Sequence, residues 1–405
     1  MIKGRDIIVM GIQAWDIEIG SNCKNLAAEM SKNNRVLYIN QPLDRKSRQT
    51  EKGSDKVRVR LEVLNGERPG LEQISDSMWV LNPKTMLESA NFLPDGPLFD
   101  WLNKLNNKRL SKAIKPAIDE LGFKDFILFN DSSMFLGLFQ KELLKPAVYV
   151  YYMRDYLTKN PYWKKHGLRI EPKLIAKADL VVNNSTLYTE YGRRFTEHSY
   201  MVGQGCEVAD FDDEINDIKI PADLDEIVNK GKPVIGYVGF LSSRRLGIQL
   251  LVELAELEPD HSFVLVGPED ESFMASKLHQ MSNVFFMGSR KPEELPGYIK
   301  GFDICLNPQL INDATIGNYP RKIDEYLAMG KPTIASSTKA MEYFKDFTYL
   351  GVNANDYHAL ITKALAEDSE ELRKGRKIFA KSHTWENNVL AIYEYIIKVK
   401  GKTWG

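Results

Sequence analysis

The most informative stretch of this 405-residue chain spans residues 318–334 and reads NYPRKIDEYLAMGKPTI. A proline before a periodic segment predicts the first turn of a helix, and Gly330 predicts its C-terminal end. Lys322 and Glu325 are three residues apart, so a helix places both on one face. That face offers an ammonium group for a diphosphate and a carboxylate for the two hydroxyls of a ribose. The alternative is a solvated helix with an ordinary ion pair between these residues.

Short apolar strands lie on both sides of this stretch and alternate with helical segments. In the C-terminal half we expect strands over residues 234–238, 262–266, 284–287, 304–307 and 333–335. In the N-terminal half we expect them over residues 6–10, 36–39, 78–81, 126–129, 147–151, 180–183 and 199–202. This alternation predicts βαβ units with parallel sheets, and hence an α/β protein of two doubly wound domains.

An acidic segment with few aromatic residues separates the two series of strands. We therefore predict an N-terminal domain over residues 1–210, a linker over 211–231 and a C-terminal domain over 232–383. The tail repeats apolar residues at helical spacing, which predicts an amphipathic helix over 384–400. Two Asp-x-Asp patterns, at 210–212 and 223–225, fall in the acidic segment, where chance matches are common, so we predict no metal site there.

Composition restricts the class of protein. Apolar residues make up 43% of the chain and charged residues 27%, as in ordinary globular proteins. No run approaches the roughly 18 apolar residues of a membrane span, and the start does not resemble a signal peptide, so we expect a cytoplasmic protein. Basic residues are not interleaved with aromatic ones, which argues against a nucleic-acid partner. The net charge is about +7 over residues 1–205 and about −8 over 206–405, which suggests an anionic ligand or surface for one half.

A glycine turn follows the first predicted strand of the C-terminal half. The sequence IGYVGF, residues 235–240, continues into SSRRLG and a predicted helix. Backbone amides at such a turn can approach a phosphate, and the helix N-terminus adds partial positive charge. Gly239, Arg244 and Arg245 are therefore candidates for a phosphate site. Glycine turns after strands also occur without a ligand.

These segments together resemble the GT-B glycosyltransferases that transfer sugars from nucleotide sugars. The pattern Pro-x-Lys-x-x-Glu-Tyr-Leu-Ala-x-Gly-Lys-Pro is similar to their donor-binding helix. Further similar segments are VIGYVGF, PDHSFVLVGP (259–268), VFFMGSRKPEELPGYIKGFDICLNP (284–308), AKADLVVNNSTLYTEY (176–191), VGQGCEVADF (202–211) and HTWENNV (383–389). The resemblance implies two Rossmann-like domains that face each other across a cleft, with the C-terminal helix packed back on the first domain.

The resemblance also implies a function and its residues. It implies transfer of a UDP- or GDP-linked sugar, without metal or other cofactor, to a glycan or lipid-linked acceptor in surface polysaccharide synthesis. Retaining members carry an acidic residue where this chain has Gly317, so the chain looks closer to membrane-associated capsular-polysaccharide transferases, some of them inverting. A nucleotide-sugar epimerase and a non-catalytic partner subunit of the same fold are the alternatives. The implied donor site comprises Gly239, Arg244, Arg245, Arg290, Lys322 and Glu325.

An inverting transfer needs a general base, and two aspartates in predicted loops are candidates. Asp155 follows the strand predicted over 147–151, where loops of an α/β sheet meet the ligand. Asp16 follows the first predicted strand and is the rival. Alternatively, Asp155 caps the next helix or pairs with Arg154. We interpret the lone His166 as structural.

Two basic segments of the N-terminal half bear on partners. Residues 101–121 combine an apolar side with Lys104, Lys108, Arg109, Lys112 and Lys115, which predicts docking of a helix on an anionic membrane surface at the cytoplasmic face. The alternative is an ordinary helix with its apolar side packed on the sheet, ended or kinked at Pro116. We predict a surface loop over residues 44–60, which either stays solvated or meets anionic groups.

Overall fold

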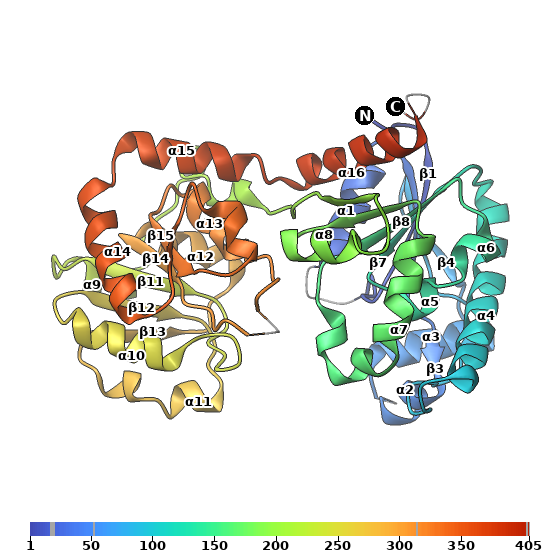
Figure 1. Ribbon diagram of the computed structural model, residues 1–405, viewed down its shortest axis with the longest axis horizontal. Coiled ribbons are helices and arrows are strands. Elements are labelled where there is room, and N and C mark those ends of the chain that lie inside the picture. The colour runs from blue at the N-terminus through green and yellow to red at the C-terminus, as the bar shows by residue number, and fades with distance from the viewer. Residues whose placement is uncertain (17–20, 52, 313–314, 402–403, 405) are drawn as a thin grey trace. The chain divides into compact units, whose positions relative to one another are not determined.

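The computed structural model describes residues 1–405 except 17–20, 52, 313–314, 402–403 and 405. It divides the chain into two compact units, drawn in Figure 1. Unit 1 comprises Met1–Gly203 together with Asn388–Gly405, and unit 2 comprises Gln204–Asn387. Each unit has its own parallel sheet covered by helices, as the alternation of strands and helices predicts.

An eight-stranded sheet forms the centre of unit 1, in the order β10-β9-β8-β7-β1-β2-β5-β4. All its neighbours pair in parallel except β4, which runs antiparallel to β5 at one edge. The strands are β1 (Asp6–Gly11), β2 (Arg35–Ile39), β4 (Leu71–Ser75), β5 (Met78–Leu81), β7 (Ile127–Asp131), β8 (Val148–Met153), β9 (Leu180–Asn183) and β10 (Ser199–Met201). Two short strands, β3 (Leu43–Asp44) and β6 (Met86–Leu87), pair separately.

Helices cover both faces of this sheet. On one face, Ile8 and Leu128 pack with Ile114 of α4 and Leu174 of α7. Near the other face, the C-terminal part of α16 (Trp385–Lys400) lies beside α1, and Asn34 donates a hydrogen bond of 2.9 Å to the Tyr393 hydroxyl (Figure 1). Besides α16, the helices of unit 1 are α1 (Asn22–Ser31), α2 (Arg45–Thr50), α3 (Asp55–Asn65), α4 (Pro97–Leu121), α5 (Met134–Gly137), α6 (Gln140–Leu144), η1 (Leu157–Lys159), α7 (Pro161–Lys177) and α8 (Thr186–Gly192).

Two expectations for unit 1 are wrong. Residues 44–51 and 53–60 are mostly helical and do not form a loop, because Asp44 caps α2, Ser54 caps α3 and Val57 of α3 is buried. Of the two expectations for Pro116, an end of α4 is wrong, because α4 continues to Leu121, and a kink there stays a prediction. Pro116 has no N–H to donate to the Lys112 carbonyl oxygen one turn earlier. Both residues lie on the exposed side of α4, where water can donate to that oxygen instead.

A six-stranded parallel sheet forms the centre of unit 2, in the order β13-β12-β11-β14-β15-β16. The strands are β11 (Val234–Val238), β12 (Ser262–Val266), β13 (Val284–Gly288), β14 (Ile304–Asn307), β15 (Thr333–Ser336) and β16 (Tyr349–Gly351). The helices are η2 (Val208–Phe211), α9 (Ala222–Val228), α10 (Ile248–Leu257), α11 (Glu271–Met274), η3 (Lys277–Gln280), η4 (Pro292–Glu294), α12 (Leu295–Lys300), α13 (Arg321–Ala328), η5 (Ala340–Phe344), α14 (Ala354–Glu367) and α15 (Glu370–Lys381).

Alternate residues along β11 enter two different cores. Val234 and Val238 pack with Tyr326 of α13, whereas Ile235 and Tyr237 pack on the face covered by α10 and α14. This period of two is what a strand covered on both faces requires.

The predicted linker is part of unit 2, and the division between the units falls before residue 204 instead of after 210. Leu224 and Ile227 of α9 are buried in the core that α12 and α13 share. Two lysines of α15 neutralise the acidic start of the predicted linker. Lys377 pairs with Asp213, and Lys381 pairs with the Asp212 carboxylate. Charge pairing and apolar burial therefore hold a segment whose composition suggests a linker.

Candidate active site

The carboxyl ends of the strands in unit 2 meet where the strand order changes direction. From β11 the sheet continues to β12 and β13 on one side, and the chain then returns to β14 on the other. Ligands of open α/β sheets bind at such a switch point, outside the carboxyl ends of the strands. Gly239 follows β11 directly, so the predicted glycine turn lies at the switch point.

Gly239 has little free space around it. Its φ is +136°, a conformation that strongly favours glycine. A Cβ atom at Gly239 would lie 2.8 Å from the Lys322 ammonium nitrogen, and one at Gly267 would lie 2.0 Å from the Gly239 carbonyl oxygen. Glycine at both positions therefore allows the loops after β11 and β12 to pack backbone against backbone, next to Lys322.

Lys322 begins the predicted donor-binding helix together with Arg321, directly after Pro320. Its ammonium group lies 4.0 Å from the centroid of the Tyr237 ring and donates a hydrogen bond of 2.5 Å to the Tyr237 hydroxyl. Within the part of the chain that the structure describes, no carboxylate forms an ion pair with Lys322. The alternative of an ion pair between Lys322 and Glu325 is therefore not realised, and the positive charge stays available at the glycine turn.

Glu325 lies one turn further along α13. Its carboxylate lines a cavity of about 640 Å³ within unit 2, together with Arg321 and Phe211. Burial raises the pKa of Glu325 above its ordinary value, although the charges of Arg321 and Lys322 oppose that effect. Among the described residues, no hydrogen bond or ion pair engages this carboxylate. A half-buried carboxylate without a partner is costly unless a ligand supplies donors, and ribose hydroxyls are such donors.

The three arginines of the predicted donor site differ in their surroundings. Arg244 and Arg245 are exposed in the loop after the glycine turn. In the described part of the chain, neither side chain has an ion pair. Arg290 is already bound: its guanidinium lies 2.7 Å from the Asp223 carboxylate and donates to the Tyr298 hydroxyl.

Asp155 lies just beyond the carboxyl end of β8 in unit 1, as its place after a strand predicts. One carboxylate oxygen lies 2.7 Å from Arg154, and the side chain keeps 42% of its surface exposed. Arg154 also forms a 2.8 Å ion pair with the fully buried Asp131 and donates to Gln13. The alternative of a pair with Arg154 is therefore realised, yet Asp155 remains accessible.

Asp16 is held more firmly than Asp155. Both of its oxygens accept hydrogen bonds from the guanidinium of Arg60, a side chain with 2% exposure. Partial burial opposes ionisation of Asp16, but the hydrogen bond and charge of Arg60 prevail and lower its pKa. His166 is fully buried and its ring stacks on Phe99 at 3.6 Å, in agreement with a structural role.

A family comparison covers the residues of the unit 2 site. Residues 232–367 match the model of the family described as Glycosyl transferases group 1. Residues 232–367 form a group 1 glycosyltransferase domain. Every predicted donor residue lies in this glycosyltransferase domain, from Gly239 to Glu325.

One curated relative matches the chain more widely. TuaH of Bacillus subtilis, a provisionally named teichuronic acid biosynthesis glycosyltransferase, is 27% identical over 244 residues. The match covers 57% of this chain and 59% of TuaH, so the chain spans about 59% of that relative's length.

Solved structures extend the comparison beyond the glycosyltransferase domain. Sucrose-phosphate synthase from Thermosynechococcus elongatus has a TM-score of 0.65 and 16% identity, covering 98% of this chain and 99% of that chain. HepE from Anabaena, in complex with UDP, has a TM-score of 0.65 and 15% identity, covering 97% of this chain and 100% of that chain. These similarities show that the chain has the GT-B fold. The cleft expected between the two domains stays a prediction.

Sequence reasoning missed several residues of the candidate site. Tyr237 contacts Lys322 from β11, but in the sequence it is one more apolar position of a buried strand. Gly267 of the glycosyltransferase domain packs on Gly239, and VLVGP gives only the general signal of a turn after a strand. Asp131 lies at the end of β7, where FNDSS shows a polar turn but not its pairing with Arg154.

Proposed function

We propose that this protein transfers a sugar from a nucleoside-diphosphate sugar to a glycan or lipid-linked acceptor in surface polysaccharide synthesis. The observation that carries the proposal is the pairing of two unneutralised groups on α13. The Lys322 ammonium lies beside the glycine turn, and the partnerless Glu325 carboxylate lines a cavity of the same unit. The similarity to TuaH, named for teichuronic acid biosynthesis, supports the polysaccharide pathway, and the HepE complexes with UDP and UDP-glucose support a nucleotide sugar.

Charge stabilisation is the main task of the unit 2 site in this proposal. When the bond between the anomeric carbon and the diphosphate oxygen breaks, negative charge develops on the departing nucleoside diphosphate. Preorganised donors and cations at that oxygen lower the barrier, and this is usually the largest catalytic effect. Lys322 supplies a cation beside the glycine turn, with Arg244 and Arg245 as accessible countercharges. Glu325 binds the ribose. We propose that these groups act without a metal.

Activation of the acceptor is assigned to Asp155 in unit 1. Its carboxylate takes the proton of the acceptor hydroxyl while the hydroxyl oxygen bonds to the anomeric carbon. Arg154 holds one carboxylate oxygen, which orients the other. Asp131, ion-paired to the same guanidinium, fixes Arg154 in turn. We therefore expect Arg154 and Asp131 to be positioning residues and Asp155 to be the general base.

An assay of nucleoside diphosphate release tests the proposal. UDP- and GDP-linked sugars are incubated with the full chain, with and without oligosaccharide or prenyl-phosphate saccharide acceptors. A transferase releases the diphosphate quickly only when an acceptor is present. Conversion of the sugar without an acceptor would identify an epimerase, and donor binding without turnover over any acceptor would identify a non-catalytic subunit.

We also propose that helix α4 docks the protein on an anionic membrane surface. No helix in the described part of the chain is long and apolar enough to span a membrane. The apolar side of α4 packs on the sheet of unit 1, but Leu98 and Trp101 stay 58% and 63% exposed at its start. Arg109 is unsuited to lipid, since it pairs with Glu88 at 2.8 Å. Four exposed lysines continue the outer side of α4: Lys104, Lys108, Lys112 and Lys115.

A further inference from the structure

A second cavity lies within unit 1, on the side of the sheet where the strands have their carboxyl ends and where Asp155 also lies. It has a volume of about 590 Å³ and opens near the carboxyl ends of β1, β2 and β7, where Ile12, Gln41 and Ser133 line it. Helices α2, α3 and α7 and the start of α4 supply the other walls. Neither Asp155 nor Asp16 lines this cavity, although its volume is typical of a small-molecule site. It is therefore a separate site and not the position of the proposed base.

One wall of the cavity is a continuous row of aromatic rings. The rings of Phe135 and Trp163 stack with centroids 5.2 Å apart, and Tyr162 meets Trp163 edge to face, also at 5.2 Å. Phe99 meets Phe135 at 5.7 Å and stacks on the buried His166. Rings that pack on one another in this way form a rigid and apolar surface.

Polar residues also line this cavity. Asn103 and Asn106 line the cavity from α4, with side-chain amides that bond to the backbone of Phe135 and Glu88, and Lys46 and Lys56 line it from α2 and α3. The most informative group is the Asn91 side-chain oxygen, which is buried and has no hydrogen-bond partner in the described structure. The amide nitrogen of Asn91 donates to the Tyr162 carbonyl oxygen at 3.1 Å, which fixes the orientation of that amide. A buried acceptor held without a donor favours a ligand with hydroxyl groups.

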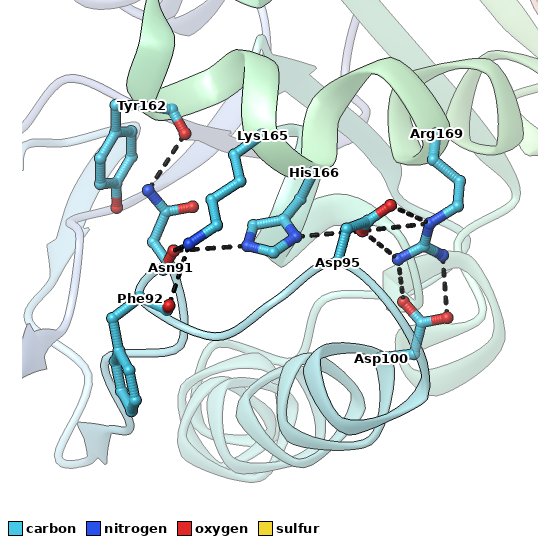
Figure 2. A network of polar contacts seen from close by, with 8 residues as sticks. All are labelled: Asn91, Phe92, Asp95, Asp100, Tyr162, Lys165, His166 and Arg169. Carbon is cyan, nitrogen blue, oxygen red and sulfur yellow. Dashed lines mark hydrogen bonds and ion pairs between the residues drawn. The ribbon is translucent and has the colours of Figure 1, made fainter.

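A charge network fixes the segment that carries Asn91 (Figure 2). Lys165 of α7 donates to the carbonyl oxygens of Asn91 and Phe92 at 3.0 and 2.9 Å. His166 lies 3.1 Å from the Asp95 carboxylate, and Arg169 binds Asp95 at 2.7 Å. The guanidinium of Arg169 holds the pKa of Asp95 down at about 2, so this anchor stays ionised at neutral pH. The wall is therefore preorganised and needs no folding on binding.

Arg169 extends the anchor to the next helix. It also binds Asp100, in the first turn of α4, at 2.8 Å. One arginine thus ties the segment before α4 and the start of α4 itself to α7. Tyr162 and Trp163 on α7 and the polar residues on α4 and the preceding segment are held in a fixed relation by this pairing.

We propose that this cavity is a saccharide subsite, which binds a ring of the acceptor glycan remote from the hydroxyl that reacts. The proposal rests on the proposed function, because it names where a longer acceptor is held. A sugar ring has an apolar face of C–H groups that fits the aromatic wall and a rim of hydroxyls that can donate to the Asn91 oxygen. A hydrocarbon chain would leave the buried Asn91 oxygen without a donor, which costs free energy.

The proposal predicts a dependence on acceptor length. A monosaccharide acceptor occupies only the position next to Asp155, whereas a longer glycan also reaches the cavity. The Trp163→Ala variant should raise KM for a trisaccharide or longer acceptor by about tenfold, while kcat and the KM of a monosaccharide acceptor hardly change. Loss of one aromatic anchor in a preorganised site has an effect of this size.

Binding of saccharides to the full chain is the direct test. The probes are a glycan array of mono- to hexasaccharides of glucose, N-acetylglucosamine and glucuronic acid, followed by calorimetry with the sugar that binds best. We expect wild type to prefer longer saccharides, and Trp163→Ala and Tyr162→Ala to lose about tenfold in affinity. Tyr162 is 54% exposed, so its variant keeps the test valid if Trp163→Ala fails to fold. The matched control is Trp101→Ala, outside the cavity, which should bind as wild type does.

Three outcomes would overturn this subsite. They are no saccharide binding on the array, equal saccharide affinity of both variants and wild type, or binding of prenyl phosphate but not of sugars at the cavity. UDP binding is measured on the same samples, because that site lies in unit 2. UDP binding without saccharide binding would overturn the subsite alone. Saccharide binding that depends on Trp163, without binding of any nucleotide, would overturn the proposed function and leave the subsite standing.

Discussion

Asp155 and Asp16 both lie in unit 1, but they differ in how many of their carboxylate oxygens accept hydrogen bonds from an arginine. Arg60 binds both oxygens of Asp16, whereas Arg154 binds one oxygen of Asp155 and divides its remaining donors between Asp131 and Gln13. A general base needs a free oxygen within reach of a hydroxyl, so the geometry favours Asp155.

The Asp155→Asn variant tests this assignment. It should lower turnover by about 10²-fold or more, the ordinary contribution of a general base, and leave donor affinity unchanged. Steady-state kinetics and calorimetry give the two quantities. Asp55→Asn is the matched control, because Asp55 is an exposed aspartate that pairs with Arg58 in the same unit. Near-normal turnover of Asp155→Asn would make Asp16 the better candidate.

Glu171 gives a prediction about stability. It is buried on α7 and accepts a 2.8 Å hydrogen bond from the Tyr151 hydroxyl, yet burial raises its pKa to about 7. In the unfolded chain the pKa of a glutamate is about 4.3. The stabilising contribution of the neutral carboxyl group is therefore complete below about pH 4 and is lost as pH rises towards 7. The loss amounts to about 4 kcal/mol above that pH.

The Glu171→Gln variant should remove this dependence on pH. Glutamine keeps a hydrogen-bond acceptor for Tyr151 but cannot ionise. Between pH 5 and pH 8, the Tm of the variant should therefore rise by about 5–10 °C relative to that of wild type. Thermal unfolding of both proteins over this range is the measurement. Parallel Tm curves would show that Glu171 is ionised in the folded protein at both pH values.

The residues of the candidate site were predictable to different degrees. Lys322, Glu325 and Gly239 could be placed because a motif fixes their spacing, and α13 and the turn after β11 carry them as expected. Tyr237 could not be foreseen, because the contact with Lys322 arises only when α13 packs on the sheet. The pairing of Arg290 with Asp223 is equally a matter of tertiary structure.

Among the elements, the strands were predicted best. Buried parallel strands are short apolar runs, and β5, β9, β11, β12 and β14 have the expected bounds. The antiparallel edge strand β4 was missed, since its residues are mostly exposed and polar. Helices α2 and α3 were missed because caps and a few buried residues stabilise them, and neither gives a strong apolar periodicity.

Helix α4 gives a prediction at the scale of an element. Replacing Lys104, Lys108, Lys112 and Lys115 by Gln should reduce recovery of the protein with anionic vesicles in flotation, because each lysine near an anionic surface contributes up to about 1 kcal/mol. High salt should abolish the recovery in the same way. Arg109→Gln is the control and should have little effect, since Arg109 pairs with Glu88. Equal recovery with neutral and anionic vesicles would contradict docking through this helix.

At the scale of the whole molecule, the proposal places donor binding and acceptor activation in different units. Unit 2 holds the glycosyltransferase domain with the candidate donor site, and unit 1 holds the candidate base and the proposed saccharide subsite. Helix α16 begins in unit 2 at Trp385, and its residues from Asn388 onward belong to unit 1. Asn388 fixes the returning segment through a 2.8 Å hydrogen bond to the Val202 carbonyl oxygen. The predicted return of the C-terminal helix to the first domain agrees with this arrangement.

Calorimetric titration of the full chain with UDP and GDP tests the central claim most directly. Wild type should bind one of the two nucleotides, and Lys322→Ala and Glu325→Ala should each weaken that binding by about tenfold or more without lowering Tm. The matched control, Lys363→Ala on α14, should bind as wild type does, because Lys363 lies outside the candidate site. Binding that both site variants retain in full, or wild type that binds neither nucleotide, would contradict the donor site on α13.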